Sequence, residues 1–151
     1  MPAVALSGSD TININNTVLA DLAIGDCVVL KFPNEIANVK TGKNGNSIYG
    51  LNESGKQCEV EIHVVRGSND DKFLNNLLSQ QQNNFAGTVL LIGQFIKKIG
   101  DGAGKITSDT YILSGGIFTK QVEGKTNVEG QPEQSVATYY MKFSNSPRAL
   151  T

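Results

Sequence analysis

The chain has 151 residues, a length suited to one domain with a sizeable core. Thirteen Lys and Arg stand against fourteen Asp and Glu without a run of either sign, which argues against a chain that attracts nucleic acid or an anionic membrane. Abundant Gly, Asn, Ser and Thr and scarce aromatic residues predict many short strands joined by tight turns.

The two ends of the chain carry little pattern. Residues 1–9 are small and weakly patterned, and we expect a flexible arm that orders on contact with a partner. They lack the basic region and long apolar stretch of a signal peptide, and no later run approaches the roughly 20 apolar residues of a membrane span. We expect synthesis in a cytosol, a folded domain over residues 10–144 and a short tail over residues 145–151.

The first strands follow the arm. Residues 11–19 alternate around an Asn15–Asn16 pair, which predicts a strand that turns back on itself. Residues 27–32 are an apolar, β-branched run that Pro33 ends, and we expect a second strand there.

A hairpin is predicted next. Residues 38–40 and 47–49 flank a turn rich in Gly and Asn at residues 41–46, where positive φ angles are tolerated. The lysine beside these glycines lacks the rest of a P-loop signature. We therefore expect a hairpin tip that projects into solvent or into a partner.

Residues 57–64 show the clearest alternation in the sequence. One face is apolar and should be buried, because residues two apart on a strand point the same way. The apolar face carries Cys58, Val60, Ile62 and Val64, and the polar face carries Gln57, Glu59, Glu61 and His63.

One helix is predicted over residues 69–82. Ser68 is a suitable N-cap, and Asp70 and Asp71 lie in the first turn, where the helix dipole favours negative charge. The two aspartates lack the ligand spacing of an EF-hand loop, so we interpret them as helix-start residues. An apolar stripe at helical spacing comprises Phe73, Leu74, Leu77 and Leu78.

The remaining elements are strands and loops. Residues 88–99 predict a long strand with a bulge or bend at Gly93, followed by a glycine-rich turn that no helix follows, so it is no phosphate cradle. Residues 105–113 and 116–122 predict two strands joined at Ser114–Gly115, and residues 136–143 a last strand. The aperiodic residues 123–134 predict a surface loop.

Candidate catalytic residues are few. His63 is the one histidine, and strand alternation separates it from Cys58, while Cys27 is the other candidate nucleophile. Glu59 and Glu61 share a face, as a carboxylate pair would, but solvated charges on a strand are the ordinary explanation. Two distant thiols and one histidine do not make a zinc site. We expect no enzyme activity, no metal and no cofactor, with both thiols reduced.

The order of elements resembles the tail tube proteins of contractile-tailed bacteriophages and their tailocin relatives. Three stretches carry the resemblance: residues 39–49, residues 58–74 and residues 110–119. The resemblance implies a mainly β fold, a two-sheet β-sandwich or barrel with one flanking α-helix, assembled into hexameric rings that stack into a hollow tube. In such rings the sheets of adjacent copies join edge to edge.

The resemblance also implies roles for two groups of residues. A lumen lined by Glu59, Glu61 and His63 would keep passing DNA from adhering, because carboxylates repel phosphates. Contacts between stacked rings would use the hairpin and the later glycine-rich turn, and the candidates are Lys40, Lys43, Asn44, Gly45, Asn46, Asp101 and Lys105.

The expected partners are copies of the same chain, then a tail sheath, a baseplate or initiator protein and a terminator. DNA would pass without specific binding, no membrane is involved, and the location would be the virion tail, assembled in the host cytoplasm. Three alternatives stay open: a tube initiator or baseplate ring subunit, a secretion-type tube protein, and a monomeric β-sandwich that binds a small ligand, which few aromatic residues disfavour. An unrecognised hydrolase ranks last.

Overall fold

The computed structural model describes residues 3–7 and 10–151, and four positions of the expected N-terminal arm (1, 2, 8 and 9) lie outside this part. The described chain is mainly β, with a ten-stranded antiparallel sheet, a separate two-stranded sheet and one α-helix. Within the arm, β1 (Ala5–Leu6) pairs with the far end of β8.

The large sheet has the strand order β3-β2-β8-β9-β11-β7-β4, with β1, β10 and β12 paired at its margins. Its principal strands are β2 (Thr11–Ile14), β3 (Thr17–Val18), β4 (Val28–Lys31), β7 (Cys58–Val65), β8 (Leu91–Gly100), β9 (Ile106–Phe118) and β11 (Val136–Asn145). The expected early turn is confirmed, because Asn15 and Asn16 have φ angles of 49° and 64° between β2 and β3.

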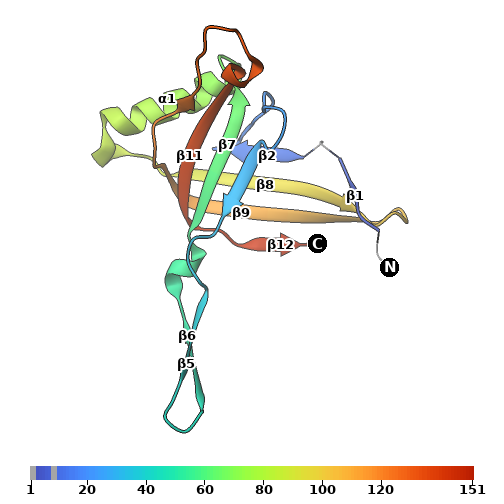
Figure 1. The fold of residues 1–151 in the computed structure, drawn as a ribbon, viewed down its shortest axis with the longest axis vertical. Helices are drawn as coiled ribbons and strands as arrows, with labels where there is room; N and C mark the ends of the chain where they lie inside the picture. The colour runs from blue at the N-terminus through green and yellow to red at the C-terminus, as the bar shows by residue number, and fades with distance from the viewer. Residues whose placement is uncertain (1–2, 8–9) are drawn as a thin grey trace.

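The sheet bends so that its two halves face each other across the core. β4, β7 and β11 run along the long axis of the molecule, while β2, β8 and β9 run across it (Figure 1). Of the expected two-sheet β-sandwich or barrel, the structure has one large continuous sheet that forms both layers, and its second sheet is the β5–β6 hairpin. This arrangement resembles an orthogonal sandwich whose layers share a strand.

The strand shared by the two halves is β9, and the predicted division into two strands joined at Ser114–Gly115 is wrong. Residues 106–113 pair with β8, and residues 114–118 pair with β11, without a reversal of the chain. Gly115 has φ of 66°, and a Cβ on Gly116 would collide with the ring of Phe143. The two glycines allow a bend and a close approach of β11, rather than a turn.

The core lies between the two halves of the sheet. The predicted apolar face of β7 is confirmed, with Cys58, Val60, Ile62 and Val64 each at most 1% exposed. Alternate residues of β11 lie beside it, and Tyr139, Met141 and Phe143 are equally buried. Ile12, Ile14, Phe95 and Leu113 supply the opposing layer.

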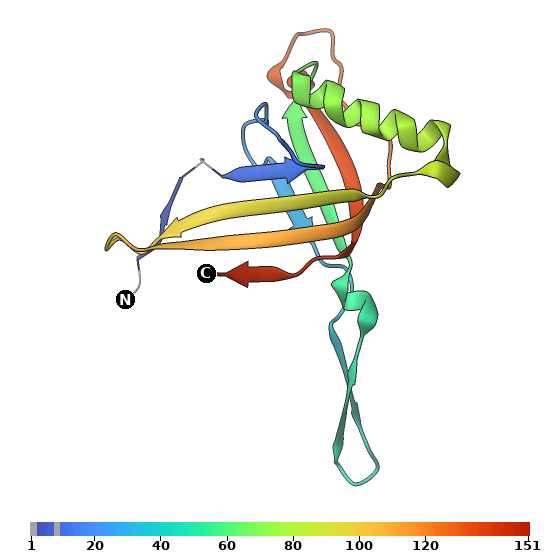
Figure 2. The same cartoon turned by 180° about the vertical axis from the view of Figure 1, so that it is seen from behind.

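The predicted helix is confirmed as α1 (Asn69–Asn83), which packs beside β7 and β9 (Figure 2). Ser68 caps it by accepting a hydrogen bond from the Asp71 amide, and Leu74 and Leu78 are buried. The Tyr139 hydroxyl donates to both the carboxylate and the carbonyl of Asp71, so the first helical turn is fastened to β11. No helix in the described ranges combines the length and apolar character that a membrane crossing needs.

The predicted hairpin is also confirmed. β5 (Ala37–Thr41) and β6 (Ser47–Leu51) pair over five residues each and project from the body of the molecule (Figure 1). Every residue of both strands is exposed. A short 3-10 helix, η1 (Glu53–Lys56), links the hairpin to β7.

The remaining strands are short. β10 (Glu123–Gly124) pairs with β11 at the start of the predicted surface loop, and β12 (Arg148–Leu150) pairs with β9 within the expected tail. Two further 3-10 turns are η2 (Phe85–Gly87) and η3 (Pro132–Ser135). Arg148 holds β12 in place through two hydrogen bonds of 2.7 Å to the Asp109 carboxylate.

Candidate functional site

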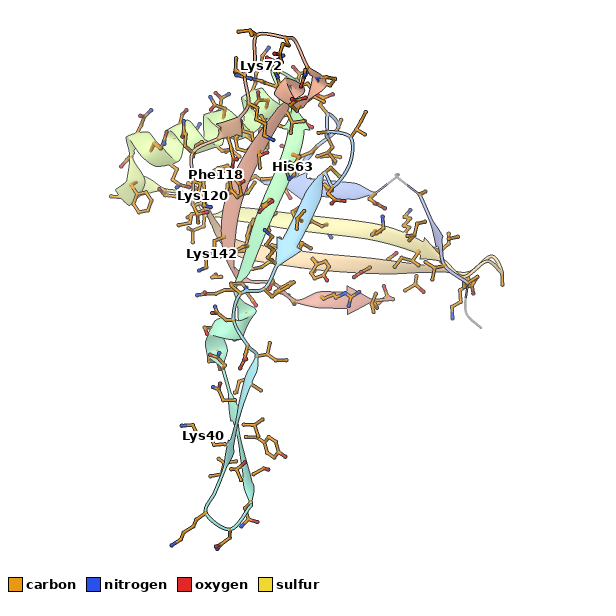
Figure 3. All side chains as sticks on the ribbon, in the orientation of Figure 1. Lys40, His63, Lys72, Phe118, Lys120 and Lys142 are labelled. Atoms are coloured by element: carbon orange, nitrogen blue, oxygen red, sulfur yellow. The ribbon has the colours of Figure 1, made fainter. Side chains whose placement is uncertain are left out.

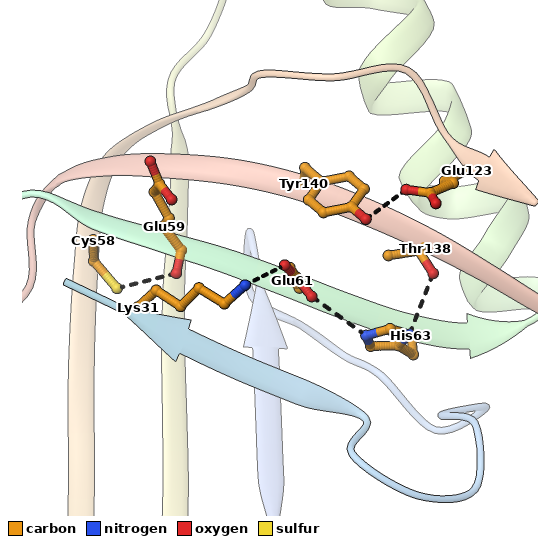
Figure 4. Close-up of polar contacts among 8 residues, drawn as sticks. All are labelled: Lys31, Cys58, Glu59, Glu61, His63, Glu123, Thr138 and Tyr140. Carbon is orange, nitrogen blue, oxygen red and sulfur yellow. Dashed lines mark hydrogen bonds and ion pairs between the residues drawn. The ribbon is translucent and has the colours of Figure 1, made fainter. Parts of the chain in front are cut away.

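The first candidate surface is the side of β4, β7 and β11 that faces away from the core. We call it the charged face, and it comprises Lys31, Glu59, Glu61, His63, Lys120, Glu123, Thr138, Tyr140 and Lys142. Register explains how these residues meet, because Glu59 lies opposite Lys31 on β4 and opposite Lys142 on β11. The three residues expected to line a lumen therefore share one face with several residues from other strands (Figure 4).

Glu61 is the centre of this surface. Lys31 Nζ lies 2.7 Å from Glu61 Oε1, and His63 Nε2 lies 3.7 Å from Glu61 Oε2. The hydrogen bond from Lys31 lowers the pKa of Glu61, against the opposing effect of partial burial, and the charges of Lys31, His63 and Lys120 add to the lowering. Glu61 is thus an ionised and already paired carboxylate.

A second polar group lies beside it on β11. The Tyr140 hydroxyl donates a hydrogen bond to the Glu123 carboxylate, and Lys120 Nζ lies 4.8 Å from the centre of the Tyr140 ring. The hydrogen bond to Glu123, followed by burial and by the charges of Glu123 and Glu61, raises the pKa of Tyr140 to about 12. The phenol is therefore neutral at physiological pH.

The charged face is electrically balanced. Its three carboxylates, on Glu59, Glu61 and Glu123, match three ammonium groups, on Lys31, Lys120 and Lys142. The acidic lining expected from residues 57–64 alone is therefore not what the whole face presents. A balanced face offers a polyanion neither a basic stripe nor a strong repulsion.

The His63 ring contacts a mostly buried threonine of β11. Thr138 Oγ1 lies 3.2 Å from His63 Nδ1, but the Thr138 residue is only 9% exposed, and the Glu61 carboxylate is shared with Lys31. Cys58 lies on the core side, where burial raises its pKa to about 11, with the backbone hydrogen bond to Lys31 opposing and the charge of Glu59 adding to the shift. Across residues 3–7 and 10–151 no cluster of three or more His, Cys, Asp or Glu has metal-binding geometry.

The second candidate surface is the hairpin. Register places Val39, Tyr49 and Leu51 on one of its faces, where each side chain is at least 63% exposed. We call these three residues the hairpin stripe. Lys40 lies on the opposite face, paired with Ile48, and the tip carries Lys43, Asn44, Gly45 and Asn46. The hairpin lies well away from His63, Lys120 and Lys142 (Figure 3).

The remaining predicted contact residues, Asp101 and Lys105, lie in the β8–β9 turn at a different end of the molecule (Figure 1). Asp101 Oδ1 accepts hydrogen bonds from the amides of Ala103 and Lys105. One copy of the chain therefore does not bring this turn and the hairpin tip together.

Sequence reasoning missed three kinds of residue. Lys31 and Lys142 were not predicted as members of this face, because their position beside Glu59 depends on strand register, which no local pattern reveals. The hairpin stripe was detectable as an alternation of Val39, Thr41 and of Tyr49, Leu51 across the turn. The exposed apolar residues of loops, Ile24 and Val128, have no such signal.

Comparison with known proteins gives no assignment: no family model matches the chain, and a search of curated proteins finds no significant match.

Proposed function

We propose that this chain is the subunit of a hollow tube of the phage-tail kind. Copies form hexameric rings, the rings stack, and DNA passes through the tube without specific binding. The subunit would be part of the virion tail, assembled in the host cytoplasm, with a sheath, an initiator or baseplate protein and a terminator as its partners. The chain has a structural role and is not an enzyme.

The observation that carries this proposal is the hairpin. An isolated two-stranded hairpin is at best marginally stable in water, yet β5 and β6 extend from the body with every residue exposed. Its base is nevertheless fastened: Asn52 Nδ2 donates to the carbonyl of Glu35, and Gly55 is buried against Ile36. A projection that is anchored at its base and carries an apolar stripe is suited to reaching another copy.

The sheet offers a lateral contact as well. β4 ends the strand order, so one edge of residues 28–31 has no strand partner within the described chain. Unpaired edges join other strands readily, which is a hazard for a monomer and a means of closure for a ring. The same half of the sheet carries the charged face, so lateral joining through β4 would continue that face from one copy to the next.

A balanced lining suits a conduit for DNA. Phosphates bind proteins mainly through uncompensated Lys and Arg, and the three lysines of the charged face are matched in number by three carboxylates, with Lys31 paired directly to Glu61. Replacing Glu59 and Glu61 with lysine should leave assembly intact and make the face strongly basic. DNA delivery should then fail, and an oligonucleotide should sediment with the tubes at low salt. Normal delivery would remove the lumen assignment.

Negative-stain microscopy of the purified protein tests assembly directly. Long hollow tubes are expected, whereas single rings would favour an initiator or baseplate subunit. Deletion of residues 43–45 should yield soluble subunits or short stacks, while Lys98→Glu, on an exposed site of β8, is a matched control that should assemble. Full-length tubes from the deletion variant would show that the hairpin tip is not a stacking element.

A monomeric ligand-binding role has one observation in its favour. A cavity of about 340 Å³ opens between β4 and β8–β9, with walls that include Ile12, Phe95, Tyr111 and Asp109. Pockets of this size and apolar character hold small molecules. A compact monomer at working concentration, stabilised by a small molecule in a thermal-shift screen, would favour this function over the tube.

A further inference from the structure

The two ends of the long axis differ in shape. One end is the hairpin, residues 37–51, and the other includes, beside the start of α1, two loops, residues 23–27 and 127–134, which we call the loop end (Figures 1 and 2). Strand pairing also places the two ends at opposite ends of β7. The strand begins at Cys58, on the hairpin side, and ends at Val65, which pairs with Val136 just after the 127–134 loop. The Cys27 carbonyl, just before β4, accepts from the His63 amide near the same end.

Both ends expose apolar side chains that the fold itself does not use. The hairpin stripe is at least 63% exposed. At the loop end Ile24 and Val128 are fully exposed. Apolar side chains that project this far from a soluble chain indicate a surface that another molecule covers.

The charges at the two ends are opposite. Residues 37–51 contain Lys40 and Lys43 and no acidic residue. The two loops contain Asp26, Glu129 and Glu133 and no basic residue. Each of these five side chains belongs to an exposed residue.

Basic residues flank the loop end without belonging to its loops. Lys72 lies on α1 near these loops (Figure 3), and Lys125 precedes them. The Arg66 guanidinium donates instead to the carbonyls of Lys125 and Gln134, so it holds the loop from within. The loop tips therefore keep an acidic character.

The loop end is organised in advance of any contact. Asn127 Oδ1 accepts hydrogen bonds from the amides of Glu129 and Gln131, and Gln134 Oε1 accepts from the amide of Asn127. Together with the Arg66 contacts, these bonds give the 127–134 loop a defined shape. A preorganised loop loses little conformational entropy when a partner binds it.

From these features we propose that the hairpin of one copy docks on the loop end of the next copy, with the hairpin stripe against Ile24 and Val128 and with Lys40 and Lys43 near Asp26, Glu129 and Glu133. This inference rests on the proposed self-assembly and adds the surface that receives the hairpin. A second copy is the occupant because its two ends complement each other in polarity and charge, whereas two hairpins would bring lysines together. A contact between opposite ends leaves one of each free, so it propagates as an open column.

Charge exchange tests the contact. The variants K40E/K43E and E129K/E133K each place like charges across the junction, so each should raise the protein concentration needed for columns at least about tenfold at low salt. The quadruple variant restores opposite charges and should return that concentration to within about threefold of the original. Sedimentation and negative-stain microscopy measure assembly, and thermal melts verify that each variant folds.

Three results would overturn the inference: columns from E129K/E133K at the original concentration, columns from K40E/K43E at that concentration, or a folded quadruple variant that stays dissociated. In these cases the original chain still forms tubes and the proposed function stands. Failure of the unchanged chain to assemble at all would instead remove the proposed function.

Cross-linking supplies a measurement independent of charge. In a Cys27→Ser background, Tyr49→Cys subunits mixed with Val128→Cys subunits should form a disulfide between copies under mild oxidation, identified by mass spectrometry. Ile106→Cys, at an exposed apolar residue where β9 begins, is the control and should not link to residue 49. A link to residue 106 in preference to residue 128 would place the hairpin elsewhere and overturn the inference.

Discussion

β7 and the β5–β6 hairpin both carry apolar residues at alternate positions of extended strands, but these residues are buried in β7 and exposed in the hairpin. Ile48 adds an apolar residue on the other face of β6. In β7 the alternate apolar residues from Cys58 to Val64 face the core and are at most 1% exposed, whereas the hairpin stripe faces solvent. Alternation therefore determines which residues share a face, and tertiary packing determines whether that face is buried.

The difference separates two uses of apolar residues in one chain. Those of β7 and β11 are needed for the subunit to fold, while those of the hairpin contribute little to the isolated subunit. Substitutions in the core should therefore lower the free energy of unfolding, whereas substitutions in the hairpin should impair assembly.

The largest contrast should come from two aromatic truncations. Phe143→Ala removes a fully buried ring that packs against Gly116 and should lower the free energy of unfolding by about 3–5 kcal/mol. Tyr49→Ala removes an aromatic ring of a residue that is 75% exposed and should change it by less than about 0.5 kcal/mol while impairing assembly. Urea denaturation of dilute subunits and sedimentation of concentrated ones measure the two effects.

Equal losses of stability from Phe143→Ala and Tyr49→Ala would contradict the division of roles. So would unimpaired assembly of Tyr49→Ala. Asn38→Ala, on the hairpin face opposite the stripe, is the matched control and should alter neither measurement.

A smaller effect is expected where the core sheet holds α1. Tyr139→Phe removes a hydrogen bond to the Asp71 carboxylate without leaving a cavity, and should cost about 1.5–3 kcal/mol. The loss should appear in urea denaturation and as faster amide exchange in the first turn of α1. Hydrogen exchange of β5 and β6 is the internal control, because the hairpin does not contact Tyr139. A stability unchanged by Tyr139→Phe would show that the helix is held by packing alone.

The buried thiol of β7 provides a pH-dependent effect of about 1 kcal/mol. Because burial raises the Cys58 pKa from 9.0 to about 11, the folded chain keeps a proton that the unfolded chain loses. This contribution is complete below about pH 9 and disappears as pH rises to about 11. The free energy of unfolding of the original chain should therefore fall more over that interval than that of Cys58→Val. The difference between the two proteins should be about 1 kcal/mol at pH 10. Parallel pH profiles for the two proteins would contradict a protonated buried thiol.

Features that depend on residues close together in the sequence could be predicted, whereas features that depend on distant residues could not. The hairpin turn, the alternation of β7 and the Ser68 cap depend on residues a few positions apart, and all three were predicted correctly. The bend of β9 was mistaken for a turn because a Ser-Gly-Gly sequence between two apolar runs has the composition of one. Its true cause is Phe143 of β11, about thirty residues later, which approaches Gly116 too closely for a side chain.

The candidate surfaces show the same limit. Glu59, Glu61 and His63 were correctly placed on one face, because alternation within a strand is local. Two of the lysines that balance them, Lys31 and Lys142, come from β4 and β11, and only the pairing of those strands with β7 reveals them. The loop end combines residues about one hundred positions apart, so neither its acidic character nor its position opposite the hairpin is visible in the sequence.

The smallest effect on global stability should come from the hairpin tip. Gly45 has φ of 82°, so Gly45→Ala would strain the turn by about 1 kcal/mol, although a Cβ there would meet no neighbouring atom. Because every residue of β5 and β6 is exposed, we expect the hairpin to unfold locally before the core, so this strain should weaken amide protection in β5 and β6 and leave urea denaturation within about 0.5 kcal/mol. Because a loosened hairpin must be reordered when it docks, assembly should need more protein. Loss of global stability equal to the local strain would mean that the hairpin and the core unfold as one unit, and the distinction between the two regions would fail.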